Sequence, residues 1–149
     1  MMTNAKRIAL ALFCAQSICL SACAGKDKII TMDELPVDAQ TFVQTYFGKS
    51  NVSVVKKDTE ILDTSYDVIL KDGSKMEFDR KGAWTGVKSR TKAIPNAIVP
   101  EKIGQYVKQN YPKDQIMSIE KDKNEYELQL SNHLELTFNK KGNLIDIDH

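Results

Sequence analysis

Hydrophobic and polar residues alternate along two stretches of the chain that share one pattern. Residues 66–87 read YDVILKDGSKMEFDRKGAWTGV, and residues 126–147 read YELQLSNHLELTFNKKGNLIDI. Alternation with a period of two is typical of strands that bury one face. Asp72-Gly73 and Lys81-Gly82 predict tight turns, because glycine accepts the positive φ that such turns require. Each stretch is therefore expected to form three strands joined by two turns.

A helix is predicted ahead of each stretch, and a fourth strand follows each helix, at residues 52–55 and 116–119. Pro36 and Pro100 suit the first turn of a helix, where the missing N–H costs nothing. Behind each proline, apolar residues recur at the spacing of one helical face and are expected to be core. They are Ala39, Phe42, Val43, Tyr46 and Phe47 in the first copy, and Ile103, Tyr106, Val107 and Tyr111 in the second.

These elements predict an α+β protein made of two tandem units, each a helix plus four antiparallel strands. We expect the two sheets to join into one curved surface, with the helices on the other face. The first unit would span residues 33–88, a linker residues 89–98, and the second unit residues 99–149. Two such units bury more apolar surface together than either buries alone.

Residues 1–22 have the pattern of an export signal. Lys6 and Arg7 precede an apolar run that ends at Leu20. This run is too short for a membrane-spanning helix, which needs about 20 apolar residues. It ends in the sequence L-S-A-C, which resembles the lipobox of bacterial lipoproteins. The resemblance implies cleavage before Cys23 and attachment of lipid to its sulfur; an ordinary signal peptide cut after Ala22 or Ala24 is the alternative.

Residues 23–32 would then tether the folded part to the lipid. The residue after Cys23 is alanine rather than aspartate. By resemblance to the sorting rules of Gram-negative bacteria, this favours the outer membrane over the inner one. The expected location is therefore the cell envelope, lipid-anchored at the outer membrane.

Charge and cysteine usage narrow the function classes. The chain has 21 basic and 20 acidic residues, and loss of Lys6 and Arg7 with the leader leaves 19 basic residues. This near-neutral balance argues against a nucleic-acid-binding protein. Cys14, Cys19 and Cys23 all lie in the leader or at its end. The rest of the chain therefore offers no thiol for a disulfide, a zinc site or thiol catalysis.

The remaining candidates for chemistry are weak. His133 falls in a predicted turn and His149 is the last residue, and neither has a second histidine at ligand spacing. No G-x-S-x-G motif or phosphate-binding glycine loop occurs. Without such a motif we expect no enzyme and no cofactor. Alternating acids on a strand are usually its solvated side, so we expect no metal site either. The acids that could contact a cation together are Asp146 and Asp148 with Asp122 or Glu120.

A binding surface is predicted on the open face of the sheet. If Thr85 and Val87 turn toward the helices, Trp84 points to this face; the opposite parity makes Trp84 cover the core, and the sequence leaves both open. Aromatic side chains are enriched at protein-binding hot spots. The other residues expected on the open face are Asp67, Ile69, Glu77, Glu127, Gln129, Glu135 and Leu144.

The repeated strands resemble the β-lactamase-inhibitor-like, PepSY-like family. The shared pattern is Y-[DE]-x-x-L, then Asp or Asn in the turn, then apolar-x-F-[DN]-x-x-G-x-[WL], within a resemblance that runs from Leu35 to Asp148. The second copy lacks the turn glycine and the tryptophan. The resemblance implies mainly a fold: a small exported protein of tandem α/β units, common in the Bacteroides group. The inhibitor that gives the family its name grips an enzyme with the concave surface of this fold. No inhibitory motif is matched, so no inhibitory residue is carried over.

Together these observations predict a non-enzymatic envelope lipoprotein that binds an extracytoplasmic protein or peptide. One form of this prediction is that binding inhibits or restrains an extracytoplasmic enzyme. The alternative is a structural or assembly lipoprotein of an outer-membrane complex, with edge strands or residues 56–65 as the contact. A carrier of a small ligand between sheet and helices is disfavoured, because the aromatic stripes are expected to fill that space.

Overall fold

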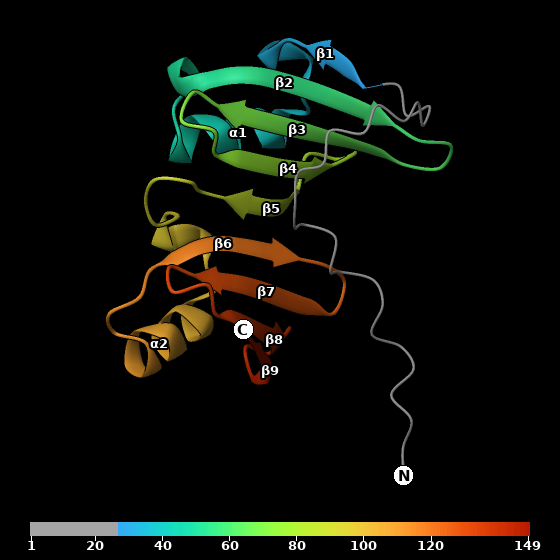
Figure 1. Cartoon of the computed structure of the whole chain (residues 1–149). Helices are drawn as coiled ribbons and strands as arrows, with labels where there is room; N and C mark the ends of the chain where they lie inside the picture. The colour runs from blue at the N-terminus through green and yellow to red at the C-terminus, as the bar shows by residue number, and fades with distance from the viewer. Residues whose placement is uncertain (1–26) are drawn as a thin grey trace.

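The computed structural model describes residues 27–149, which form one nine-stranded antiparallel sheet with two helices (Figure 1). Each strand pairs with its neighbours in the sequence. No helix in this range is long and apolar enough to cross a membrane. The strands are β1 (Lys28–Ile30), β2 (Val52–Thr59), β3 (Thr64–Leu70), β4 (Lys75–Asp79), β5 (Trp84–Lys88), β6 (Ile116–Lys121), β7 (Glu125–Leu130), β8 (Glu135–Asn139) and β9 (Leu144–Asp148), and the helices are α1 (Val37–Tyr46) and α2 (Glu101–Asn110).

This architecture corrects the predicted fold class. Two tandem helix-plus-four-strand units, with helices on one face, were expected; the structure is mainly a single continuous sheet with two short helices. The sheet does not divide, because β5 and β6 pair directly, with Val87 opposite Ile119. The connection at residues 89–98 also contacts β6, where the Ile94 N–H donates to the Ile116 carbonyl at 2.9 Å.

Strand β1 was not predicted from the sequence. It pairs antiparallel with β2, and Ile30 lies opposite Val55. Ile30 is buried, whereas Ile29 is 72% exposed. The strand falls within residues 23–32, the range expected to be a tether. Residues 1–26, with the predicted signal peptide and Cys23, lie outside the described part of the chain.

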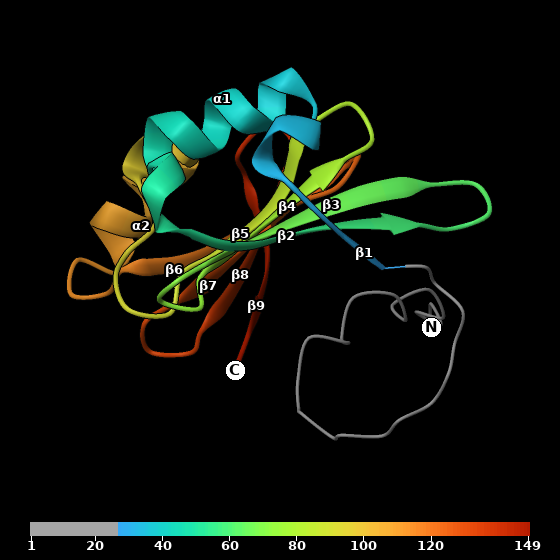
Figure 2. The ribbon, with the colours of Figure 1, turned by 90° about the horizontal axis from the view of Figure 1, so that it is seen from above.

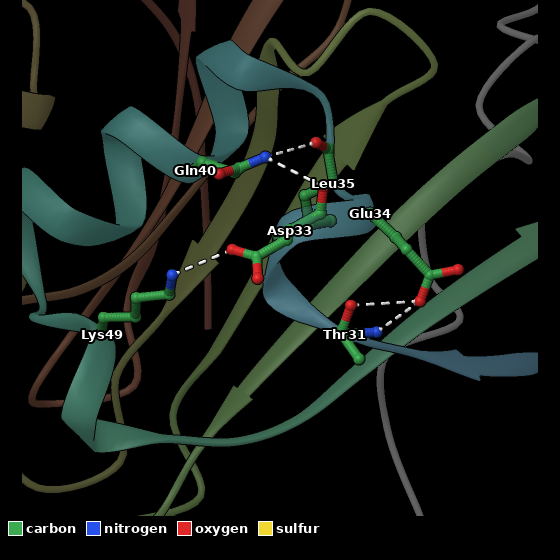
Figure 3. A network of polar contacts seen from close by, with 6 residues as sticks. All are labelled: Thr31, Asp33, Glu34, Leu35, Gln40 and Lys49. Atoms are coloured by element: carbon green, nitrogen blue, oxygen red, sulfur yellow. Dashed lines mark hydrogen bonds and ion pairs between the residues drawn. The ribbon is translucent and has the colours of Figure 1, made fainter.

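Polar contacts fix the chain between β1 and α1 (Figure 3). The Thr31 N–H donates to Glu34 Oε2 at 2.8 Å, and the Thr31 hydroxyl lies 3.2 Å from the same oxygen. The backbone hydrogen bond, followed by the side-chain one, lowers the pKa of Glu34. In the first turns of α1, the Gln40 amide donates to the Leu35 carbonyl at 2.9 Å. These bonds hold the entry to the helix beside the edge of the sheet.

An aromatic pair joins each helix to the sheet. The ring of Phe42 in α1 lies edge-on to Phe78 of β4 at 5.6 Å between centroids, and Tyr106 of α2 lies edge-on to Phe138 of β8 at 5.4 Å. Phe78 and Phe138 are fully buried. Burying a side chain of this size stabilises the fold by about 1.5–3 kcal/mol. We call the face that carries these two rings the core face, and the opposite one the open face.

The core face is continuous across the strongly twisted sheet that Figure 2 shows. Aliphatic side chains from six strands line it between and beside the two phenylalanines. Those most deeply buried include Val68, Met76, Val87, Ile119, Leu128, Leu130 and Leu136. The apolar layer therefore extends through the β5–β6 junction without interruption.

Glycine is required where the β4–β5 turn meets α1. Gly82 has φ +89°, and a Cβ added there would lie 2.7 Å from the Cβ of Pro36 and 3.0 Å from the backbone nitrogen of Ala39. Gly142 in the β8–β9 turn has φ +73°, but its nearest neighbour is the flexible side chain of Lys102, at 3.1 Å. A side chain at position 82 would thus meet rigid groups, whereas one at position 142 would meet a flexible lysine side chain.

We expect Gly82→Ala to destabilise the protein more than Gly142→Ala. The left-handed backbone costs either alanine about 1–2 kcal/mol. At position 82 the clash with Pro36 and the helix backbone adds at least about 1 kcal/mol, as overpacking does in a core. Urea denaturation of both variants measures the difference in the free energy of unfolding. Equal losses would show that the contact with α1 is not rigid.

Candidate functional site

A line of carboxylates crosses the centre of the open face. Asp67 of β3 lies opposite Glu77 of β4, and Glu120 of β6 lies opposite Glu127 of β7. Gly86 of β5 stands between the two pairs, opposite both Glu77 and Glu120. Residues paired in this way share one face of an antiparallel sheet. We call Asp67, Glu77, Glu120 and Glu127 the acidic row.

The absence of a side chain at Gly86 leaves room inside the acidic row. A Cβ there would lie 3.2 Å from Glu77 Oε2 and 3.6 Å from Glu120 Cγ. Both glutamates therefore border the space above β5. A cavity of about 150 Å³ opens beside it, lined by Glu77, Thr85, Glu120, Lys121, Asp122, Glu125 and Glu127.

One end of the acidic row is neutralised by a lysine of β4. Lys75 Nζ lies 2.9 Å from the Asp67 carboxylate and 2.7 Å from that of Glu77. Burial alone would lower the pKa of Lys75, but its hydrogen bonds to Glu77 and Asp67 outweigh burial and raise it. The charges of Asp67 and Glu77 are thus held in a compact, partly buried cluster with a cation.

The other end of the acidic row has an excess of negative charge. Burial, followed by the charge of Glu77, raises the pKa of Glu120. Burial and then the charge of Glu120 raise the pKa of Glu127 to about 7. Ionising these partly desolvated, like-charged groups costs free energy that an incoming cation or basic side chain would recover. This end of the row is the part of the face best suited to receive positive charge.

The structure brings six of the predicted surface residues together on the open face. The Gln129 amide lies 3.4 Å from Glu135 Oε1, and Gln129 is the next residue of β7 after Glu127 that faces the same side. Ile69 is opposite Lys75. The six are Asp67, Ile69, Glu77, Glu127, Gln129 and Glu135. Five of these six side chains are polar and Ile69 is aliphatic, so the surface that they form from β3 to β8 is mainly polar.

Trp84 and Leu144 lie on the core face instead, paired with Phe78 and Phe138. The cause is an irregularity in each pairing. Trp84 is opposite Phe78, yet Gly86 is opposite Glu77, so β5 holds one extra residue there. A β-bulge of this kind changes which residues face each side of the sheet. Because of the extra residue, Trp84 lies on the core face together with Val87, and the alternative that placed Trp84 on the open face is wrong.

Trp84 is half-buried beside α1 and β6. Its ring centroid lies 6.3 Å from that of Phe42, and Lys121 Nζ is 4.1 Å from the ring. A cation over an indole face is attracted by the ring quadrupole. Burial, then the charge of Lys140, lowers the pKa of Lys121. Trp84 thus closes the end of the core and holds a lysine rather than presenting a free aromatic face.

Glu120 belongs to the acidic row but was not among the residues predicted for the open face. Its place there depends on the β5–β6 pairing, which joins Gly86 to Glu120. A local signal exists, because Glu120 follows the buried Ile119 and so must face away from the core. The signal does not tell which carboxylates of other strands lie beside it.

A larger hollow lies away from the acidic row, beside α2 and the start of β6. Its volume is about 960 Å³, and its walls include Tyr111, Pro112 and Gln115. The charged groups on its rim are of both signs, Glu101 and Asp114 against Lys108. It contains none of the predicted site residues, and its mixed charge favours no class of ligand.

Known proteins resemble this chain in sequence and in fold. A family model described as "Putative beta-lactamase-inhibitor-like, PepSY-like" matches residues 64–146. A crystal structure described as a putative periplasmic protein of the DUF2874 family from Bacteroides vulgatus is 46% identical, with a TM-score of 0.81 over 85% of this chain and 99% of that one. No curated protein matches the chain.

Two further solved structures have the same fold. One is described as a putative calcium-regulated periplasmic protein from Bacteroides thetaiotaomicron; it is 44% identical, with a TM-score of 0.80 over 83% of this chain and 97% of that one. The other, described as a putative periplasmic protein of unknown function from Bacteroides vulgatus, is 32% identical, with a TM-score of 0.78 over 83% and 99%.

The acidic row does not form a ready-made calcium site in this chain. Within residues 27–149, no group of three or more His, Cys, Asp or Glu side chains is arranged to hold a metal ion. Calcium takes about six to eight oxygen ligands at roughly 2.3–2.6 Å. The acidic row has four carboxylates on four strands, and two of them already contact Lys75. Calcium regulation is part of the description of that relative.

We expect Glu127→Gln to stabilise the protein in a pH-dependent way. Because the folded state raises the pKa of Glu127 from 4.5 to about 7, its ionisation opposes folding once the pH exceeds 4.5. The gain should be about 1 kcal/mol at pH 8, after allowing for solvent screening, and near zero at pH 4. Urea denaturation at both pH values measures it.

Glu60→Gln, in the exposed β2–β3 hairpin, is the matched control and should change stability little at either pH. A gain from Glu127→Gln that is the same at pH 4 and pH 8 would contradict the electrostatic origin of the effect.

Proposed function

The chain belongs to the β-lactamase-inhibitor-like, PepSY-like family, and we propose that it is a non-enzymatic binding module of the cell envelope. Its relatives are described as putative periplasmic proteins, which supports export of this chain. The module docks an extracytoplasmic protein or peptide, and by occupying that partner it inhibits or restrains it.

The negative end of the acidic row is the observation that carries this proposal. Glu120 and Glu127 are partly buried on the open face, and their pKa values are raised by burial and by neighbouring acids. A lysine or arginine of a partner would relieve this repulsion in the bound state. Complementary charge of this kind steers association and selects partners. The open face therefore suits a partner with a basic surface.

A structural role in an outer-membrane complex is the second candidate. The tip of the β2–β3 hairpin exposes Ile61 fully and Leu62 to 93%. Figure 1 shows this hairpin reaching beyond the rest of the sheet. It lies within residues 56–65, the range expected to make the contact in an assembly protein. Two adjacent exposed aliphatic side chains at a projecting tip suit insertion into an apolar groove of another subunit.

The envelope anchor is also proposed from the sequence. Residues 1–22 would be removed as a signal peptide, and the sulfur of Cys23 would carry the lipid that holds the module at the outer membrane. One lipid chain gives only marginal membrane binding, so the several chains of a bacterial lipoprotein would be needed for a stable anchor.

A capture experiment tests the docking face. The double variant Glu120→Gln/Glu127→Gln should retain at most about a tenth of the envelope proteins that the unmodified protein captures at low salt, because it removes both carboxylates that would ionise against a basic partner. Quantitative mass spectrometry of the captured proteins is the measurement. Glu101→Gln, on the exposed surface of α2, is the control and should capture normally. Undiminished capture by the double variant would exclude the acidic row as the docking site.

A second experiment tests the anchor. Cys23→Ala should leave the precursor uncleaved and abolish incorporation of labelled palmitate, because only the cysteine sulfur accepts the lipid. Cys19→Ala, inside the apolar run, should be processed normally. Fractionation and palmitate labelling measure both effects, and normal cleavage of Cys23→Ala would indicate an ordinary signal peptide.

A further inference from the structure

Strand β9 forms one edge of the sheet and leaves apolar side chains uncovered. Among the described strands it pairs with β8 alone. An edge strand presents backbone N–H and C=O groups that an incoming strand can pair with. Ile145 is 48% exposed and Ile147 is 42% exposed. The edge thus offers both backbone groups and apolar surface.

Strand β5 is the counterpart of β9 in the first half of the sheet, but it has a neighbouring strand on both sides. Met76 of β4 lies opposite Val87 of β5, as Leu136 of β8 lies opposite Ile147 of β9. On its other side β5 pairs with β6, which places Ile119 opposite Val87. Val87 is only 2% exposed, against 42% for Ile147. The exposed edge of β9 therefore corresponds to a position that is fully covered by an antiparallel strand elsewhere in the sheet.

The charge around β9 determines which strand fits. Asp148 lies opposite Glu135, and Asp146 is on the same face of the strand. If two copies paired antiparallel through Ile147, Asp146 of one would oppose Asp148 of the other. Like charges in opposite positions destabilise a sheet. A second copy is therefore disfavoured, whereas a strand with basic side chains on this face is favoured.

We propose that β9 accepts an extended segment of the partner protein as a tenth antiparallel strand, in which basic and apolar side chains alternate. The basic side chains face Glu135 and Asp148 on the open face. The apolar side chains cover Ile147 on the core face, as Ile119 covers Val87. This inference rests on the proposed binding function and adds to it the edge that is used and the pattern of the partner.

Peptide titration tests the proposal. The probe is a fluorescein-labelled heptapeptide in which lysine and valine alternate. Two control peptides have the same composition in block order, or glutamate in place of lysine. The alternating basic peptide should bind at least about tenfold more tightly than either control, because only it matches both the strand period and the charge.

A pair of matched variants locates the binding site. Ile147→Lys places a charge on the edge strand, which blocks pairing, and should weaken binding about tenfold. Ile29→Lys makes the same change on the opposite edge, where Ile29 is 72% exposed, and should leave binding unchanged. Hydrogen–deuterium exchange of the unmodified protein with peptide should show slower exchange at residues 144–148, which does not depend on any variant.

Several results would overturn the proposal. The first is equal affinity of Ile147→Lys and the unmodified protein for the peptide, and the second is slower exchange in β1 rather than in β9. The third is loss of peptide binding by Glu120→Gln/Glu127→Gln while Ile147→Lys still binds the peptide. A dimer in sedimentation that Ile147→Lys dissociates would show that a second copy occupies the edge.

Failure of this inference can be told from failure of the proposed function. If Ile147→Lys still captures the envelope partner that Glu120→Gln/Glu127→Gln loses, the binding function holds and the tenth strand is wrong. If the alternating peptide binds β9 but no envelope protein is captured, the edge is competent and the proposed function is wrong.

Discussion

The pairing of β5 with β6 is the contact on which the rest of the molecule depends. It joins two groups of strands that are separated by a connection, a helix and a loop, and it makes their apolar faces one layer around Phe78 and Phe138. The same pairing places Glu77 and Glu120 on either side of Gly86. The β5–β6 hydrogen bonds thus position both the core on one side of the sheet and the acidic row on the other.

The two faces differ in what they contribute. The core face stabilises the fold by burial, whereas the far end of the open face opposes it through repulsion between partly desolvated carboxylates. A free energy cost that is kept at a surface is typical of sites whose function needs a strained or exposed arrangement. Lys75 compensates Asp67 and Glu77, so the cost is concentrated at Glu120 and Glu127.

The alternation of residues was enough to predict most strands and the turns at Gly73, Gly82 and Gly142, because period and turn chemistry are local properties. The turn at His133 reaches φ 69° without a glycine, and the His133 N–H donates to the Leu130 carbonyl at 3.0 Å, as the Gly73 N–H does to the Leu70 carbonyl. Strand β1, the β5–β6 pairing and the side of Trp84 were not predictable, since they depend on distant backbone partners or on one extra residue in a strand. For this reason Glu120 was not placed with the other acids.

The order of strands in the sheet is the order of strands in the chain. Six of its eight pairings are hairpins between consecutive strands, which lowers the contact order of a β protein, and low contact order favours rapid folding. A chain that emerges from a translocation channel N-terminus first can add each strand to the edge formed just before it. The sheet can therefore grow one strand at a time in this order, and β9 is the last of the described strands to join it.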